Sequence, residues 1–199
     1  MQFPRTVLAP ALVLSALLAT TAHAQNTLPV TFEVRGGASI PTGDFADGVK
    51  TGWNVGGAVL FSPSPNLALY AGYQHDELTI DDDDTEEVDL GVQDNGLRAG
   101  ARLSVPLATG TVRPWVEGGL LYNRTTISGS DGEVSASFDS SWELGFEVGG
   151  GFSFDVSPTI SLTPGIRYRQ HKVDFGDLAD GATGDVNTVV VDLGINFHP

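Results

Sequence analysis

The sequence contains no cysteine. This absence excludes disulfides, cysteine-ligated metals, a thiol nucleophile and the lipid-modified cysteine of a bacterial lipoprotein. Basic residues are also scarce, since 10 Lys and Arg stand against 25 Asp and Glu and give a net charge of -15. Such an acidic chain is a poor partner for nucleic acid, and its few basic residues exclude electrostatic adsorption to anionic lipid. Any association with a membrane must therefore come from apolar surface.

Long apolar runs are missing after residue 24, because no stretch approaches the roughly 18 residues that a membrane-spanning helix needs. The first 24 residues have a basic start at Arg5, an apolar run from Val7 to Leu18 and the ending Ala22-His23-Ala24. This pattern predicts a cleavable secretory signal at 1–24, followed by one domain at 25–199. An N-terminal membrane anchor is the alternative, but its apolar run is short and is interrupted by Pro10.

Strict alternation of apolar and polar residues dominates the rest of the chain. Between Thr31 and Ile40, for example, every second residue is apolar or glycine. A period of two predicts β-strands. The same pattern occurs in eight segments, around 31–40, 52–61, 67–75, 97–107, 112–123, 142–154, 160–171 and 188–197. Strands of about ten residues are long enough to cross a bilayer when tilted.

The connections between these segments alternate in length. Short turns are expected at 62–66, 108–111 and 156–159, and longer polar loops at 41–51, 76–96, 124–141 and 172–187. Short turns at one end and long loops at the other are typical of outer-membrane barrels, with the short turns in the periplasm. A soluble barrel has no reason for such asymmetry.

Glycine indicates which face of each strand points into a barrel. The face that carries the charges also has a glycine near the middle of every predicted strand, at Gly37, Gly56, Gly72, Gly100, Gly119, Gly149, Gly165 and Gly194. Small residues at mid-height suit a narrow lumen that must also hold bulky charged side chains. The predicted lumen charge network consists of five acidic and five basic residues: Glu33, Arg35, Arg98, Arg102, Glu117, Glu143, Glu147, Arg167, Arg169 and Asp192.

The positions of the turns set the strand register and so predict which charged residues of this network pair across strands. A turn at 108–111 places Arg102 opposite Glu117, and a turn near Pro158 places Glu147 against Arg167 or Arg169. Cross-strand pairs of opposite charge make a buried lumen tolerable. The competing interpretation is a soluble sheet with charges scattered over its surface.

Aromatic residues gather at both ends of the apolar face. One set lies toward the long loops and the other toward the short turns: Trp53, Tyr73, Tyr122, Trp142 and Tyr168, and then Phe32, Phe61, Phe152, Phe154 and Phe197. Two such girdles around an aliphatic band are expected of a protein embedded in a bilayer.

The sequence resembles the small eight-stranded outer-membrane barrels of the OmpA/OmpX kind. The resembling segments are Arg35-Gly36-Gly37 with the following PTGDF at 41–45, GWNVGG at 52–57, GIRY at 165–168 and the closing strand that ends at Phe197. The resemblance implies an all-β, eight-stranded antiparallel up-and-down transmembrane β-barrel in the cell outer membrane. It also implies outer-membrane lipid and the barrel assembly machinery as partners, and we expect a monomer.

Two candidate chemistries compete with a purely structural role. The loop from Asp76 to Asp89 is dense in carboxylates and could hold Ca²⁺ or Mg²⁺, but it lacks EF-hand spacing, and a solvated acidic loop is the favoured explanation. Outer-membrane lipid A deacylases place a His and a Ser two residues later at the outer rim, but here Lys172 and Val173 follow His171. We therefore expect no enzyme, no cofactor and no dedicated metal site.

The predicted function is that of an outer-membrane barrel with a charge-plugged lumen and acidic extracellular loops, in a structural or surface-interaction role. A narrow channel for small solutes is the alternative, and a lipid-modifying enzyme is the third possibility. The loops contain no motif that identifies a ligand.

Overall fold

The computed structural model describes residues 29–80, 89–105, 112–130, 135–174 and 183–199. Its strands are β1 (Val30–Pro41), β2 (Val49–Ser64), β3 (Leu67–Ile80), β4 (Asp89–Ser104), β5 (Val112–Ser130), β6 (Ser135–Asp139), β7 (Glu143–Ser157), β8 (Ile160–Asp174) and β9 (Thr183–Phe197). A short 3-10 helix, η2 (Gly43–Ala46), lies between β1 and β2. The predicted signal at 1–24 and the predicted turn at 108–111 lie outside the described residues.

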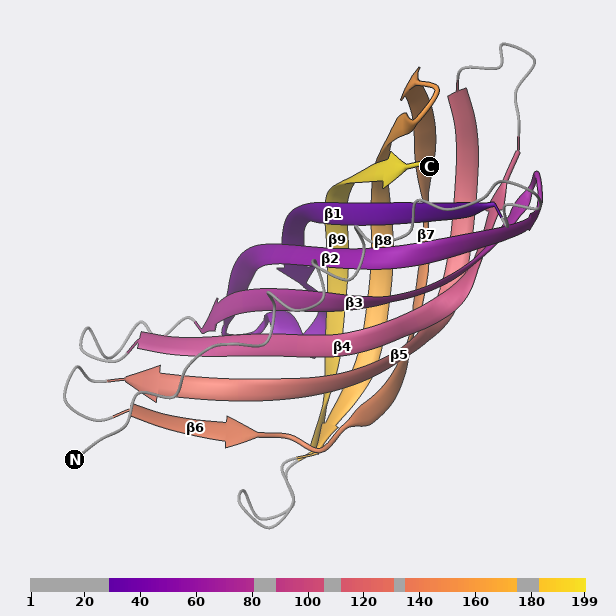
Figure 1. Ribbon diagram of the computed structural model, residues 1–199. Coiled ribbons are helices and arrows are strands. Elements are labelled where there is room, and N and C mark those ends of the chain that lie inside the picture. Colours follow the sequence, from indigo (N-terminus) through magenta and orange to yellow (C-terminus); the bar gives the residue numbers. More distant parts are fainter. Residues whose placement is uncertain (1–28, 81–88, 106–111, 131–134, 175–182) are drawn as a thin grey trace, which may run out of the picture.

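These strands form one closed antiparallel barrel (Figure 1). Successive strands pair along the chain from β1 to β6 and from β7 to β9, and β1 pairs with β9. Both β6 and β7 pair with β5, β6 with its C-terminal part and β7 with its N-terminal part, so they are two sections of one barrel strand. The predicted eight-stranded up-and-down barrel is therefore confirmed.

The strands extend further toward the long-loop end than the sequence predicts. β3 continues to Ile80, β4 begins at Asp89, and β5 continues to Ser130. The prediction that Asp76 lies in a loop is therefore wrong, because Asp76 pairs with Asp94 inside the β3–β4 ladder. The short turns match better, since β2 and β3 are separated by two residues and so are β7 and β8.

The two faces of the barrel differ as the alternation requires. Large aliphatic residues on the outer face stay exposed, among them Leu120, Leu144 and Ile166 at 65, 69 and 55 %. A soluble monomer rarely exposes so much apolar surface, so this band is the lipid-facing surface. Aromatic side chains at both ends of the band are 40 to 50 % exposed: Trp53, Tyr73, Tyr122, Trp142, Phe152, Phe154 and Phe197.

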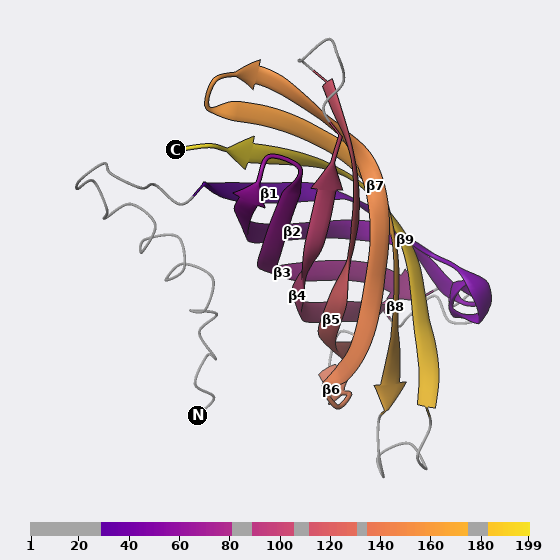
Figure 2. The same ribbon diagram turned by 90° about the vertical axis from the view of Figure 1, so that its right-hand side faces the viewer.

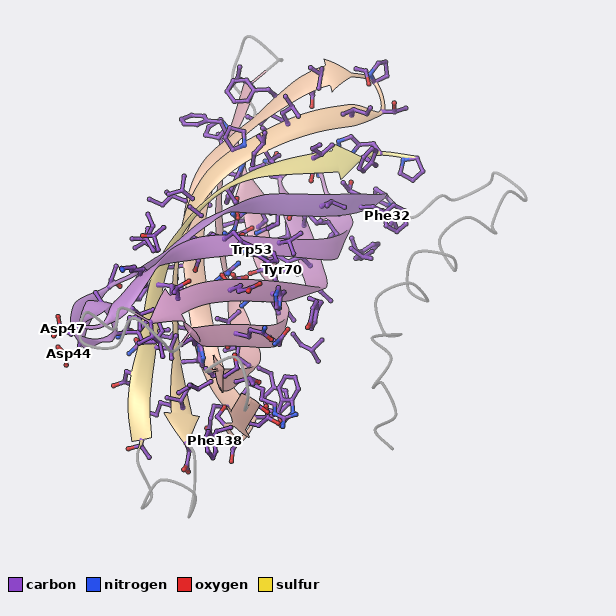
Figure 3. All side chains as sticks on the ribbon, turned by 90° about the vertical axis from the view of Figure 1, so that its left-hand side faces the viewer. Phe32, Asp44, Asp47, Trp53, Tyr70 and Phe138 are labelled. Atoms are coloured by element: carbon purple, nitrogen blue, oxygen red, sulfur yellow. The ribbon has the colours of Figure 1, made fainter. Side chains whose placement is uncertain are left out.

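The two ends of the barrel are distinct. Figure 2 shows the C-terminus at the same end as the β2–β3 and β7–β8 turns. Figure 3 shows Asp44 and Asp47 at the long-loop end, with Phe32 at the opposite end. Within the described residues, no helix has both the length and the apolar character needed to span a membrane.

Candidate functional site

Glu117 on β5 is the centre of an ion-pair cluster inside the barrel. Its Oε2 accepts from Nε of Arg102 at 2.8 Å, and its Oε1 accepts from Nε of Arg167 at 2.5 Å and from Arg98 at 3.2 Å. Nη1 of Arg35 lies 3.6 Å from the same Oε1. Four arginines from β1, β4 and β8 thus surround one carboxylate, whose side chain has no exposed surface.

The remaining acidic groups connect these arginines to one another. Glu33 accepts two hydrogen bonds from Arg102, at 2.7 and 3.2 Å, and pairs with Arg35. Three further carboxylates complete the set: Glu147 with Arg98 at 3.0 Å and Arg169 at 3.5 Å, Asp192 with Arg167, and Asp76 with Arg169 at 3.2 Å. We call these ten residues the lumen network. Their side chains are at most 4 % exposed, so each charge depends on its neighbours for solvation.

The structure brings together nine of the ten residues that sequence analysis selected. Arg102 pairs with Glu117 across β4 and β5, and Glu147 pairs with Arg169 across β7 and β8, as the register predicts. Glu143 lies on the same face but is only half-buried and makes no ion pair with the described residues. Asp76 takes its place, so five basic groups still face five acidic ones.

Two aromatic residues of the lumen escaped sequence analysis. Tyr70 donates from its hydroxyl to Glu147 at 2.7 Å, and its ring lies 4.6 Å from the guanidinium carbon of Arg98. The ring of Trp115 lies between Arg102 and Arg167, with centroid distances of 4.6 and 5.0 Å. Cation–π contacts of this kind stabilise desolvated guanidinium groups. The alternation of the sequence could have identified them, because each lies two residues before a predicted lumen position, Tyr70 before Gly72 and Trp115 before Glu117.

The glycines of the lumen make room for these two rings. A Cβ on Gly151 or Gly165 would lie 2.7 Å from atoms of the Trp115 ring, and Gly100 and Gly119 lie against the Tyr70 hydroxyl. Contacts this short do not occur between real Cβ atoms and aromatic rings. The mid-strand glycines therefore act by leaving space.

A second polar group lies above the lumen network, toward the long loops. Asp94 accepts from Asn123 at 2.6 Å and from Thr125 at 3.2 Å, and Nε2 of His171 lies 3.3 Å from it. His171 is thus buried inside the barrel, whereas a deacylase histidine faces the lipid. Ser140 bonds with the amide of Thr125 and the carbonyl of Ser141, so it is not a partner for His171.

The lumen face becomes apolar beyond this group. Leu78 and Val92 are cross-strand partners at the outer end of β3 and β4, and both are at most 3 % exposed. Val173 and Val186 are buried at the outer ends of β8 and β9. In the described part of the chain no cluster of three or more acidic or histidine side chains could hold a metal ion. Residues 81–88, which carry most of the predicted acidic loop, lie outside that part.

His198 forms a polar bridge across the opposite, short-turn end. Its Nδ1 lies 3.0 Å from Thr31 Oγ1, and its Nε2 lies 2.9 Å from Ser161 Oγ. Ser161 donates to Asp155 at 2.7 Å, so it accepts from Nε2–H, and Nδ1 accepts from Thr31. These bonds fit a neutral ring. Burial and the nearby Arg113 lower the pKa of His198 below 6.5, against the opposing effect of Asp155.

This lowered pKa predicts an acid-dependent loss of stability. The unfolded chain binds the His198 proton more readily than the folded chain does, so stability is complete above pH 6.5 and declines as pH falls from 6.5 through the lowered folded-state pKa. We expect the stability difference between the parent and His198→Gln to shrink over that interval, as measured by urea unfolding at several pH values. Parallel pH profiles for the two proteins would contradict the prediction.

Comparisons with known proteins agree with this architecture. The sequence matches the family model described as outer membrane protein beta-barrel domain over residues 11–197. Neisserial surface protein A has a similar structure, with 16 % identity, a TM-score of 0.62, and coverage of 85 % of this chain and 97 % of that chain. A major outer membrane protein from Thermus thermophilus has 16 % identity, a TM-score of 0.52, and coverage of 84 % and 98 %. Comparison with curated proteins gives no match.

Proposed function

Because the chain belongs to the outer membrane protein beta-barrel domain family and is a protein of the bacterial outer membrane, we propose that its lumen is blocked and that its role is structural and surface-presenting. In this proposal the lumen network is a plug that stabilises the barrel and blocks passage. The long-loop end presents acidic residues such as Asp44 and Asp47 to the outside. The protein acts as a monomer, embedded in outer-membrane lipid after insertion by the barrel assembly machinery.

The observation that carries this proposal is the position of Glu117 among four arginines. Eight strands enclose a lumen just wide enough for side chains. At mid-height this lumen contains the five guanidinium groups of the lumen network, their carboxylates and the rings of Tyr70 and Trp115. Opening a passage would require several of these pairs to separate in a low-dielectric interior, which costs several kcal/mol for each uncompensated charge.

A narrow channel for small solutes is the second candidate. It is favoured by buried polar atoms on both sides of the lumen network that have no hydrogen-bond partner within the described part of the chain. Asn54 and Gln74 carry such atoms toward the outer end, and Thr163 and Asn196 carry them toward the short-turn end. Polar atoms of this kind are normally satisfied by water. Two hydrated sections separated by the plug would form a channel if the plug could open.

Conductance measurements distinguish the two candidates. The chain from Gln25 to Pro199 would be refolded and inserted into planar bilayers beside the variants Glu117→Ala and Glu143→Ala. We expect the parent and Glu143→Ala to be silent, because the lumen network is intact in both. A reproducible conductance in the parent that rises in Glu117→Ala would overturn the structural role and establish the channel.

Two further parts of the proposal concern chemistry at the loops and the rim. Divalent cations are candidate partners of the acidic loop at 76–89, where calcium titration monitored by calorimetry is the direct test. An enzymatic role in lipid modification is the third possibility, although His171 is buried inside the barrel and is followed by Lys172 and Val173. Unchanged lipid A in cells that overproduce the protein would contradict that role.

A further inference from the structure

A polar cavity lies at the short-turn end of the lumen, below the lumen network. It has a volume of about 100 Å³, and its lining includes Pro65 and Asn66 between β2 and β3 and His198 near the C-terminus. Its lining combines apolar and polar side chains, and the polar ones include Arg102, Arg113, Trp115, Thr163, Asn196 and His198. We call this cavity the periplasmic vestibule. Its volume allows several water molecules or one small polar ligand.

The charged residues in the vestibule lining differ in sign from the net charge of the chain. The protein has 25 acidic residues and a net charge of -15, yet none of the described residues that line the vestibule is Asp or Glu. Two arginines are in the lining instead, together with His198, whose ring is neutral. The carboxylates that balance them lie outside it: Glu33 and Glu117 pair with Arg102, and Asp155 pairs with Arg113 at 2.6 Å. Because the charged side chains among the described lining residues are arginines, the lining favours an anion over a cation.

Three deeply buried side chains in the lining carry polar atoms that have no hydrogen-bond partner among the residues that the structure describes. These atoms are Nε1 of Trp115, Oγ1 of Thr163 and Oδ1 of Asn196, and the three residues are 3, 1 and 6 % exposed. Buried polar atoms are normally hydrogen-bonded. The indole N–H can only donate, the hydroxyl can donate or accept, and the amide oxygen can only accept. A fitting ligand therefore offers acceptor oxygens on one side and at least one O–H donor on another.

We propose that the periplasmic vestibule binds inorganic phosphate, a phosphate group that retains at least one proton at neutral pH. Such a group has oxygens to accept from Trp115 and Thr163 and an O–H to donate to Asn196. Arg113 supplies positive charge at the mouth, where its side chain is 36 % exposed and can reorient. The site faces the periplasm and does not depend on whether the barrel conducts, so it extends the proposed function without relying on it.

The indole of Trp115 provides a direct readout. The chain contains three tryptophans, and the other two, Trp53 and Trp142, lie on the outer face at the long-loop end. In a ¹H–¹⁵N spectrum of the protein refolded in non-ionic detergent, assigned with the variants Trp53→Phe and Trp142→Phe, phosphate would be titrated at constant ionic strength. We expect a saturable shift of the Trp115 indole signal while the other two indole signals stay fixed. A Trp115 signal that does not move would overturn the proposal.

Arg113→Gln and Arg124→Gln form a matched pair of variants. Both arginines are partly exposed and paired with one aspartate, Arg113 with Asp155 and Arg124 with Asp139, but Arg124 lies at the long-loop end. We expect Arg113→Gln to weaken phosphate binding by roughly tenfold or more, as is typical for a lost hydrogen bond to a charged group. Arg124→Gln should stay within about twofold of the parent. Equal weakening by both variants would show a general charge effect and would overturn the site.

Other anions identify the chemical class. Sulfate has the same shape but carries no proton at neutral pH, so it leaves Asn196 unsatisfied and should bind more weakly than phosphate. Equal shifts with sulfate or with chloride would contradict the requirement for an O–H donor. Phosphatidylglycerol added to the micelles tests the other source of phosphate. Saturation by this phosphodiester, but not by inorganic phosphate, would overturn the proposal in favour of a lipid headgroup site.

Discussion

Replacement of Glu117 by alanine is expected to lower the free energy of unfolding by roughly 3 to 5 kcal/mol. The carboxylate has no exposed surface and is within 3.6 Å of Arg35, Arg98, Arg102 and Arg167. Without it, the lumen keeps its arginines but loses the group that all four contact. Removing one partner of a buried ion pair lowers the free energy of unfolding by this amount because the remaining charge stays in an environment that cannot solvate it.

Urea unfolding in detergent micelles, monitored by circular dichroism, measures this loss, and two variants make it interpretable. Glu117→Gln keeps the shape of the side chain and should recover only part of the stability, because the amide has no charge. Glu143→Ala removes a carboxylate from the same face, where it makes no ion pair with the described residues, and should change stability by less than about 0.5 kcal/mol. A Glu117→Ala midpoint that matches the parent would contradict our description of the lumen.

Much of this arrangement could be predicted from the sequence, because alternation and turn length determine register locally. Arg102 and Glu117 are joined by a short connection, so a count of residues from the turn places them opposite each other. The face was also predictable, since a lumen needs small residues among its charges. Gly100 and Gly119, for example, are on the same face as these two residues and are cross-strand partners.

Contacts across the lumen could not be predicted in this way. Arg102 binds Glu33, which is 69 residues away and lies on β1, a strand that does not pair with β4. Such a contact depends on the tilt and stagger of the whole barrel. The lumen position of residues at the long-loop end of β3 was not predicted for a simpler reason. The alternation through Gln74, Asp76 and Leu78 continues the lumen face of β3, but the acidic residues that follow made the segment resemble a loop.

Alanine at Gly119 and alanine at Gly118 are expected to have very different effects, although the two residues are neighbours on β5. The side chain of an alanine at position 119 would enter the lumen against the Tyr70 hydroxyl and 2.6 Å from the carbonyl oxygen of Ala99. At position 118 it would point outward, with its nearest contact 3.8 Å away. We expect Gly119→Ala to cost roughly 1 to 3 kcal/mol through overpacking. Gly118→Ala should stay within about 1 kcal/mol of the parent and can stabilise it.

A variant of Tyr70 tests whether the destabilisation by Gly119→Ala arises from crowding inside the lumen. Its hydroxyl is held in place by the 2.7 Å hydrogen bond to Glu147, so it cannot move away without breaking that bond. Removing the hydroxyl with Tyr70→Phe should therefore reduce the cost of Gly119→Ala, whereas the small effect of Gly118→Ala should not change. A double-mutant cycle by urea unfolding measures this coupling, expected at roughly 0.5 kcal/mol or more. Coupling of the same size at both glycines would mean that alanine acts through the backbone of β5, and space inside the barrel would no longer explain why glycine lies on its inner face.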